Sequence, residues 1–208
     1  MKIHFNYLTF LFLLLSGSIF AQTTLDSLSI KASFNFGKSV AVFGGSVSVI
    51  PESDSAKVLW EKHLGLTITN YGVPGAGFSS LQGKSMQQQV DEAGVFDIYI
   101  LWASTNDYNY CIKKIYEINP NATIYFFTSS KAFNDRGAYD PFYTEGMVQH
   151  VDMQKMICEL HGIPVLDQFL LGGYNIYNKD LYYRDPIHMN VVGYKKLGEL
   201  QVSFLAFP

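Results

Sequence analysis

A serine, a histidine and an aspartate in this sequence have the residue types and the local spacing of a nucleophile with its base. Ser46 directly follows two glycines at the end of an apolar run, and Asp185 stands three residues before His188. A serine hydroxyl becomes a useful nucleophile when a base within hydrogen-bonding reach takes its proton, and a carboxylate that holds the base improves it. These residues therefore predict acyl-transfer chemistry, provided that the fold brings both ends of the chain together.

Each of these patterns also has a purely structural interpretation. Gly44, Gly45 and Ser46 could form an ordinary strand-to-helix loop in which Ser46 caps the helix. Asp185 and the following proline could form a turn before the C-terminal helix, with His188 incidental, because proline stiffens a turn and keeps the preceding residue out of helical geometry.

Acyl transfer also needs hydrogen-bond donors for the oxygen atom that becomes negative. The candidates are the backbone N–H groups of Ser46 and Gly75 and the side-chain amide of Asn106. Gly75 lies in a glycine-rich loop over residues 70–78, and Asn106 follows the longest apolar run of the mature chain. A simple turn and a helix cap remain the alternative explanations for these two residues.

The elements that must position these residues follow from an alternation of short apolar runs with amphipathic segments. We expect strands at 39–46, 66–69, 96–103, 122–128 and 163–166, and helices at 54–64, 81–93, 111–118, 144–161 and 191–204. In the first helix, Asp54 is expected to be the cap and Gly65 the stop. This order predicts an α/β fold, a three-layer α/β/α sandwich with about five parallel strands. Because the carboxyl ends of parallel strands share one edge, the loops with Ser46, Gly75 and Asn106 are expected to converge there.

The N-terminus has the layout of a secretory signal peptide. Lys2 precedes the apolar block Leu8–Leu15, and Ala21 offers a small residue for cleavage. We therefore expect a signal peptide over residues 1–21, a single domain over 22–208, export to the periplasm or the cell exterior, and no stable membrane anchor after cleavage.

The net charge, the cysteines and the spacing of the histidines restrict the class of protein further. The net charge is −3 and no basic run is present, so no nucleic-acid partner is expected. Cys111 and Cys158 could pair in an oxidising compartment, although two unlinked buried thiols are the interpretation that we favour. The histidines show no metal-ligand spacing, and we expect neither a metal nor a cofactor.

Taken jointly, four segments resemble the conserved blocks of the SGNH (GDSL-like) hydrolase family, in the right order over nearly the whole mature chain. They are Phe43–Ser46, Asn70–Gly75, Ser104–Asp107 and Asp185–His188. The resemblance implies a flavodoxin-like sandwich in which Ser46 attacks an ester, His188 and Asp185 complete the triad, and Ser46, Gly75 and Asn106 form the oxyanion hole.

Two positions depart from the family's pattern. Gly45 stands where the family usually has an aspartate that would brace the nucleophile loop, and Ser104 replaces the glycine that usually opens the third block. Small displacements at a reacting centre can cost on the order of 10²-fold in rate, so a catalytically impaired relative is an alternative.

The expected function is that of an exported serine esterase that removes a small acyl group, acetyl among them, from a small-molecule or glycan substrate. Acetylated carbohydrate is favoured by the predicted export and by tyrosine-rich loops. Substrate contacts are expected in the loop over residues 129–143, which contains Lys131, Arg136 and Tyr139. The alternatives are a carbohydrate-binding or accessory protein on the same scaffold, and a purely structural exported protein.

Overall fold

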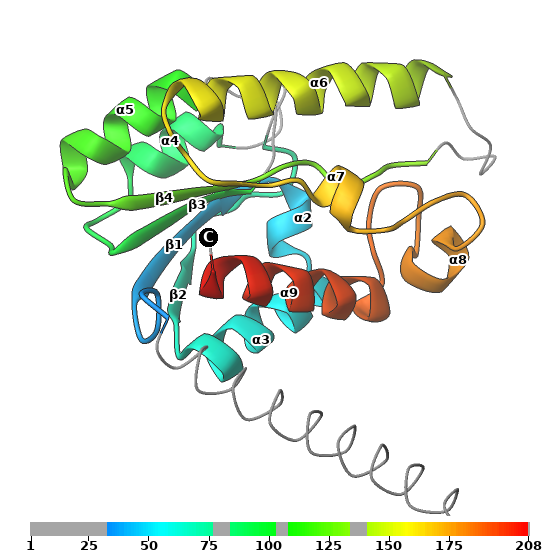
Figure 1. Cartoon of the computed structure of the whole chain (residues 1–208), viewed down its shortest axis with the longest axis horizontal. Coiled ribbons are helices and arrows are strands. Elements are labelled where there is room, and N and C mark those ends of the chain that lie inside the picture. The colour runs from blue at the N-terminus through cyan, green and yellow to red at the C-terminus, as the bar shows by residue number, and fades with distance from the viewer. Residues whose placement is uncertain (1–32, 77–83, 103–107, 134–140, 208) are drawn as a thin grey trace, which may run out of the picture.

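The protein folds around a five-stranded parallel sheet with the order β2-β1-β3-β4-β5 (Figure 1). The structure is a computed structural model that describes residues 33–76, 84–102, 108–133 and 141–207, with only the backbone described for 141–145. The strands are β1 (Ser39–Gly44), β2 (Thr67–Asn70), β3 (Ile98–Trp102), β4 (Thr123–Phe127) and β5 (Val165–Leu166). All four neighbouring pairs are parallel.

Helices cover both faces of the sheet, as Figure 1 shows. One layer contains α4 (Met86–Asp91), α5 (Tyr108–Ile118) and α6 (Pro141–Leu160). The other contains α3 (Asp54–Leu64) and α9 (Val191–Ala206). Short helices lie in the connections: α2 (Ser46–Val49), the 3₁₀ helix η1 (Pro51–Ser53), α7 (Gln168–Leu171) and α8 (Lys179–Tyr182). The predicted three-layer α/β/α sandwich is confirmed.

Strand β1 shows why the two layers hold together. It lies between β2 and β3, and its residues alternate between two hydrophobic cores. Val40 and Val42 pack in the core with Trp60 of α3, whereas Ala41 and Phe43 pack in the core under α4 and α5. A central parallel strand is buried on both faces, which explains the continuous apolar run that precedes Ser46.

Several boundaries differ from the sequence-based expectation. The first strand ends at Gly44, and Ser46 instead begins α2. The prediction that Asp54 caps α3 is wrong: Ser53 holds the cap position, because η1 runs directly into the helix. Gly65 does end α3, with a φ of +61° that glycine adopts without strain. The short helices α2, α7 and α8 were not expected.

The described part of α4 is shorter than the predicted helix over 81–93. The helix begins at Met86 behind a capping box in which Ser85 and Gln88 satisfy each other's backbone N–H groups. Residues 81–83 lie outside the described residues.

The two cysteines are both buried, and no disulfide joins Cys111 to Cys158. None of the helices in the described ranges is long and apolar enough to cross a membrane. The predicted signal peptide over residues 1–21 lies outside the described residues, so it stays a prediction.

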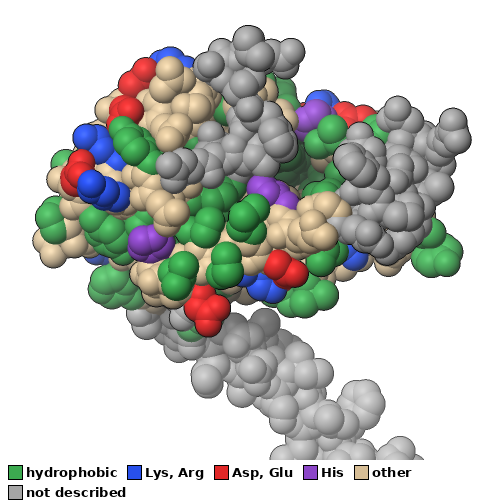
Figure 2. All heavy atoms as spheres, turned by 90° about the horizontal axis from the view of Figure 1, so that it is seen from above, with side chains coloured by type: hydrophobic (Ala, Val, Ile, Leu, Met, Phe, Trp, Pro, Cys, Tyr) green, Lys and Arg blue, Asp and Glu red, His purple; other side chains and the backbone are tan. Residues whose placement is uncertain are grey.

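Charged side chains of both signs are intermixed on the face seen in Figure 2. Ion pairs between described residues include Lys114 with Glu117 on α5, at 3.4 Å, and Lys84 with Glu92 at the ends of α4.

Candidate active site

The nucleophile candidate lies at the carboxyl edge of the central strand. β1 ends at Gly44, and after Gly45 the chain turns into α2 with Ser46 as its first residue. A Cβ atom at position 44 would lie 2.6 Å from the carbonyl oxygen of Trp102 and 2.8 Å from Ser48 Oγ. Only glycine therefore lets the end of β1 lie this close to β3 and to the turn of α2.

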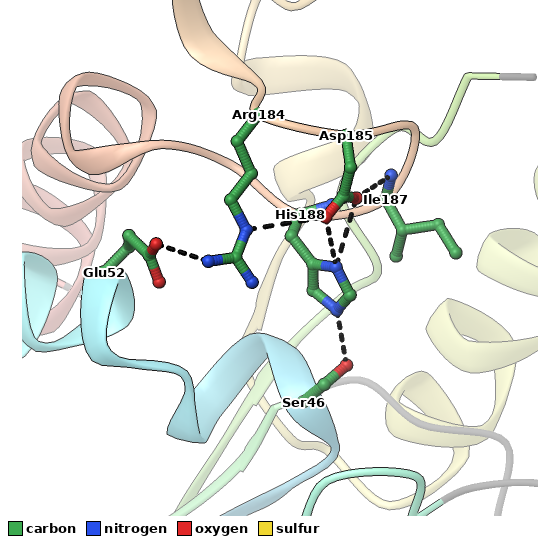
Figure 3. A network of polar contacts seen from close by, with 6 residues as sticks. All are labelled: Ser46, Glu52, Arg184, Asp185, Ile187 and His188. Carbon is green, nitrogen blue, oxygen red and sulfur yellow. Dashed lines mark hydrogen bonds and ion pairs between the residues drawn. The ribbon is translucent and has the colours of Figure 1, made fainter. Parts of the chain in front are cut away.

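The structure brings Ser46, His188 and Asp185 together in one chain of contacts (Figure 3). His188 Nε2 lies 2.9 Å from Ser46 Oγ, although the two residues come from opposite ends of the domain. On the other side of the ring, His188 Nδ1 lies 2.9 Å from Asp185 Oδ2 and 3.1 Å from Asp185 Oδ1. With a proton on Nδ1 donated to the carboxylate, Nε2 is free to accept the serine proton.

Asp185 is held as a carboxylate by donors from its own turn. Burial by itself would raise its pKa, but the backbone N–H groups of His188 and Ile187 both donate to Oδ1 at 2.7 and 2.9 Å. Together with the His188 ring, these donors lower the pKa of Asp185 to about 2. The carboxylate is therefore ionised throughout the neutral range, as an acid that orients an imidazole must be.

Arg184 connects the Asp185 loop to the segment that follows the nucleophile. Its Nε lies 3.4 Å from Asp185 Oδ2, and its Nη1 forms an ion pair with Glu52 Oε1 in η1 (Figure 3). Because η1 follows α2 directly, the guanidinium joins the two loops that present Ser46 and His188.

The loop from Arg184 to His188 is also fixed by backbone contacts. The N–H of Arg184 donates to the carbonyl oxygen of His188, beside an isolated antiparallel bridge between Tyr183 and Met189. From the chain after β4, the N–H of Phe133 donates to the carbonyl oxygen of Pro186 at 2.7 Å. The loop is thus anchored at its base and at its tip.

The loop after β2 supplies the second candidate for the oxyanion hole. Val73 N–H donates to the carbonyl oxygen of Gly44 at 3.1 Å, so this loop runs alongside the end of β1. Gly75 has a φ of +76°, which favours glycine. Within the described part of the chain, the N–H groups of Ser46 and Gly75 donate no hydrogen bond.

Asn106 and Ser104 lie outside the described residues, so the third oxyanion-hole donor stays a prediction. In the predicted substrate loop, Arg136 and Tyr139 are outside the described residues as well. Lys131 is described: its ammonium group lies over the ring of Phe169, 5.3 Å from the centroid. The carbonyl oxygen of Lys131 accepts a hydrogen bond from the hydroxyl of Tyr183 at 2.7 Å, so this segment packs beside the start of the His188 loop.

Several residues around the candidate site were missed by sequence reasoning. Asn70 donates from Nδ2 to the carbonyl oxygen of Ser48 at 2.7 Å and accepts from Gly72 N–H, which ties α2 to the loop after β2. Lys57 donates to the same Ser48 oxygen at 2.9 Å.

Gln89 reaches the backbone of Gly44 from α4. One signal for the role of Gln89 was available in the sequence. It is a polar residue on a helix face that also carries the apolar residues Met86 and Val90, both of which are buried.

Gly45, the main departure from the family pattern, has a packing reason in this structure. A Cβ atom at position 45 would lie 2.8 Å from the carbonyl oxygen of Ala76, next to Gly75. We expect Gly45→Asp to lower kcat by about 10²-fold, because the loop with Gly75 must move away from Ser46. The check is ester turnover of this variant beside Gly94→Asp, whose Cβ would meet no atom within 4 Å. Unchanged or higher turnover of Gly45→Asp would contradict the expectation.

Several solved structures share this fold, and their own names describe an acetylxylan esterase, a lipolytic protein and a lipase/acylhydrolase. A catalytic mutant of Axe2, an acetylxylan esterase from Geobacillus stearothermophilus, superposes with a TM-score of 0.61 at 13% identity, over 85% of this chain and 97% of that one. A member of the lipolytic protein G-D-S-L family from Veillonella parvula gives a TM-score of 0.56 at 16% identity, over 79% of this chain and 96% of that one.

A lipase/acylhydrolase from Enterococcus faecalis is similar to the same extent, with a TM-score of 0.55, 16% identity, and coverage of 81% of this chain and 95% of that chain. No family model matches the sequence, and a search of curated proteins finds no match. At these identities the likeness shows the fold, and the expected resemblance to SGNH/GDSL-like hydrolases is confirmed at that level.

Proposed function

We propose that this protein is a serine esterase of the SGNH/GDSL type. The observation that carries the proposal is the 2.9 Å contact between His188 Nε2 and Ser46 Oγ, with Asp185 on the opposite ring nitrogen. A nucleophile, a base and an orienting acid in hydrogen-bonding sequence are what acyl transfer requires. The fold shared with solved esterases supports the same conclusion.

The reaction begins with attack of Ser46 Oγ on the ester carbonyl carbon while His188 Nε2 takes the serine proton. Asp185 stabilises the imidazolium that forms. The carbonyl oxygen becomes negative and accepts hydrogen bonds from the N–H groups of Ser46 and Gly75, with Asn106 as the proposed third donor. His188 then gives its proton to the departing alcohol, which leaves an acyl group on Ser46.

Water completes the cycle. His188 takes a proton from the incoming water, the hydroxide attacks the acyl carbon, and Ser46 leaves with the proton returned by the imidazolium. In both steps the proton passes through Nε2 of His188, so residues of this chain supply the acid–base chemistry.

The proposed substrates are small acyl esters, acetyl esters of carbohydrate among them. Support comes from the predicted export and from the named activity of one similar structure, an acetylxylan esterase. Export to the periplasm or the cell exterior is itself part of this proposal, based on the layout of residues 1–21.

The test combines turnover with covalent labelling. The purified protein is assayed with p-nitrophenyl acetate, butyrate and octanoate and with acetylated xylo-oligosaccharide, and separately treated with a fluorophosphonate. We expect turnover that favours the shorter acyl chains, and mass spectrometry of the labelled protein should place the phosphonyl group on the peptide with Ser46. A protein that neither turns over these esters nor takes the label would instead be a binding or accessory protein.

A further inference from the structure

The end of the nucleophile strand is clamped by a side chain from a different helix. Gly44 N–H donates to Gln89 Oε1 at 2.9 Å, and Gln89 Nε2 donates to the carbonyl oxygen of Gly44 at 3.0 Å. The carboxamide thus pairs with both polar groups of one residue, as a neighbouring strand would. Gln89 lies in α4 and is 1% exposed.

Gly44 is connected to two parts of the candidate site: the nucleophile candidate Ser46 and the loop that carries Gly75. Gly44 is the last residue of β1, two positions before Ser46. Its carbonyl oxygen also accepts from Val73 N–H in the loop that leads to Gly75. A shift of Gly44 would therefore move the nucleophile and the oxyanion loop together.

The orientation of the carboxamide is set by a third contact. Gln89 Nε2 also donates to the carbonyl oxygen of Lys84 at 3.2 Å. A flipped amide would place its oxygen against the carbonyl oxygens of Gly44 and Lys84 and its nitrogen against the Gly44 N–H. All three contacts favour the one orientation, and a buried amide with these partners is costly to disturb.

The neighbouring glutamines do not share this role. Gln88 belongs to the capping box at the start of α4 and is exposed, whereas Gln89 lies on the face that packs on the sheet between Met86 and Val90. A polar residue buried on an apolar helix face needs a partner, and here the partner is the backbone of the nucleophile strand.

We propose that Gln89 is a positioning residue that sets the place of Ser46 relative to His188. It takes over the bracing for which Gly45 has no side chain and no room. The inference rests on the proposed esterase function. Gln89 acts through the backbone of Gly44 rather than through contact with the substrate.

The first experiment compares Gln89→Met with Gln201→Met. Gln201 is the matched control because it is also buried, accepts from Trp60 Nε1 at 3.1 Å and donates to Gln168 Oε1 at 3.2 Å, so that neither of these partners is the backbone of Gly44. Both variants should lower the melting temperature. Only Gln89→Met should lower kcat, by about 10²-fold with KM changed less than about twofold, because the loss arises from misplacement of the reacting group.

A second variant, Gln89→Glu, tests the donor half of the clamp. One carboxylate oxygen still accepts from Gly44 N–H, but the other opposes the carbonyl oxygen of Gly44 unless it is protonated. The ratio of its kcat to that of the unaltered protein should rise as pH falls. A residue with a merely structural role would give a ratio that is independent of pH.

Two measurements keep the inference testable without turnover. Amide hydrogen exchange at Gly44, followed by NMR, should accelerate in Gln89→Met, and a crystal structure of that variant should show Ser46 Oγ outside hydrogen-bonding distance of His188 Nε2. If the unaltered protein is inactive but both changes occur, the proposed function fails and the positioning role stands. If kcat, the Ser46–His188 contact and the pH ratio all stay unchanged while the melting temperature falls as in Gln201→Met, the positioning role is wrong.

Discussion

Replacing Ser46 with alanine is expected to lower kcat for ester hydrolysis by about 10⁶-fold, to the level set by the remaining oxyanion donors and substrate binding. The methyl group keeps the start of α2 but leaves His188 Nε2 without the hydroxyl that lies 2.9 Å away. No acyl-enzyme can then form. The measurement is turnover of p-nitrophenyl acetate together with fluorophosphonate labelling of the variant.

The matched control for this prediction is Ser203→Ala. Ser203 is an exposed serine of α9 whose hydroxyl donates to the carbonyl oxygen of Glu199 in the same helix. This variant should keep full activity and full labelling. If Ser46→Ala retains the turnover of the unaltered protein, the nucleophile is another group and the esterase mechanism derived above is wrong.

The second large effect is expected for Asp185→Asn, with a loss of about 10⁴-fold in kcat. In the unaltered protein, hydrogen-bond donors contact both carboxylate oxygens of Asp185. The amide of asparagine has only one oxygen, so its N–H₂ group faces some of these donors. The ring of His188 then favours the tautomer with its proton on Nε2, which cannot accept the proton of Ser46. Pre-steady-state assays should show slow acylation, whereas substrate binding should change little.

Asp185 also predicts how stability depends on pH. Its pKa is lowered from 3.8 to about 2, so the folded state binds its proton less tightly than the unfolded chain does. The stabilising contribution is therefore complete above the unfolded pKa and is lost as pH falls through about 2. Urea unfolding should show Asp185→Asn as less stable than the unaltered protein at pH 7, with a smaller difference near pH 2. An equal difference at both values would contradict the lowered pKa.

Local sequence patterns determined most of the layered architecture. The apolar runs that became β1 and β3 are continuous because both faces of a central parallel strand are covered, and this single requirement predicted the strand type and the sandwich. Helix ends were predictable where one residue decides them, as at Gly65. They were not predictable where a preceding element intervened, as at η1 before Asp54.

The candidate residues were recognisable from their types and from their places after strands. Ser46 and Gly75 follow β1 and β2, and in a parallel sheet such positions share an edge without any further information. The short spacing between Asp185 and His188 likewise restricts how far apart their side chains can lie. Sequence alone therefore determined which residues could react and on which edge of the sheet they would stand.

Only the tertiary structure decided how these residues are held. The contact between His188 and Ser46 depends on the turn that Arg184 and Phe133 anchor. The need for glycine at position 45 depends on the carbonyl oxygen of Ala76, which is remote in sequence. Gln89 shows the same limit, because its partner is a backbone peptide of β1 that carries no sequence signal. Hydrogen bonds to backbone groups and close backbone approaches are set by the path of the chain in space, and residue types along one segment do not encode them.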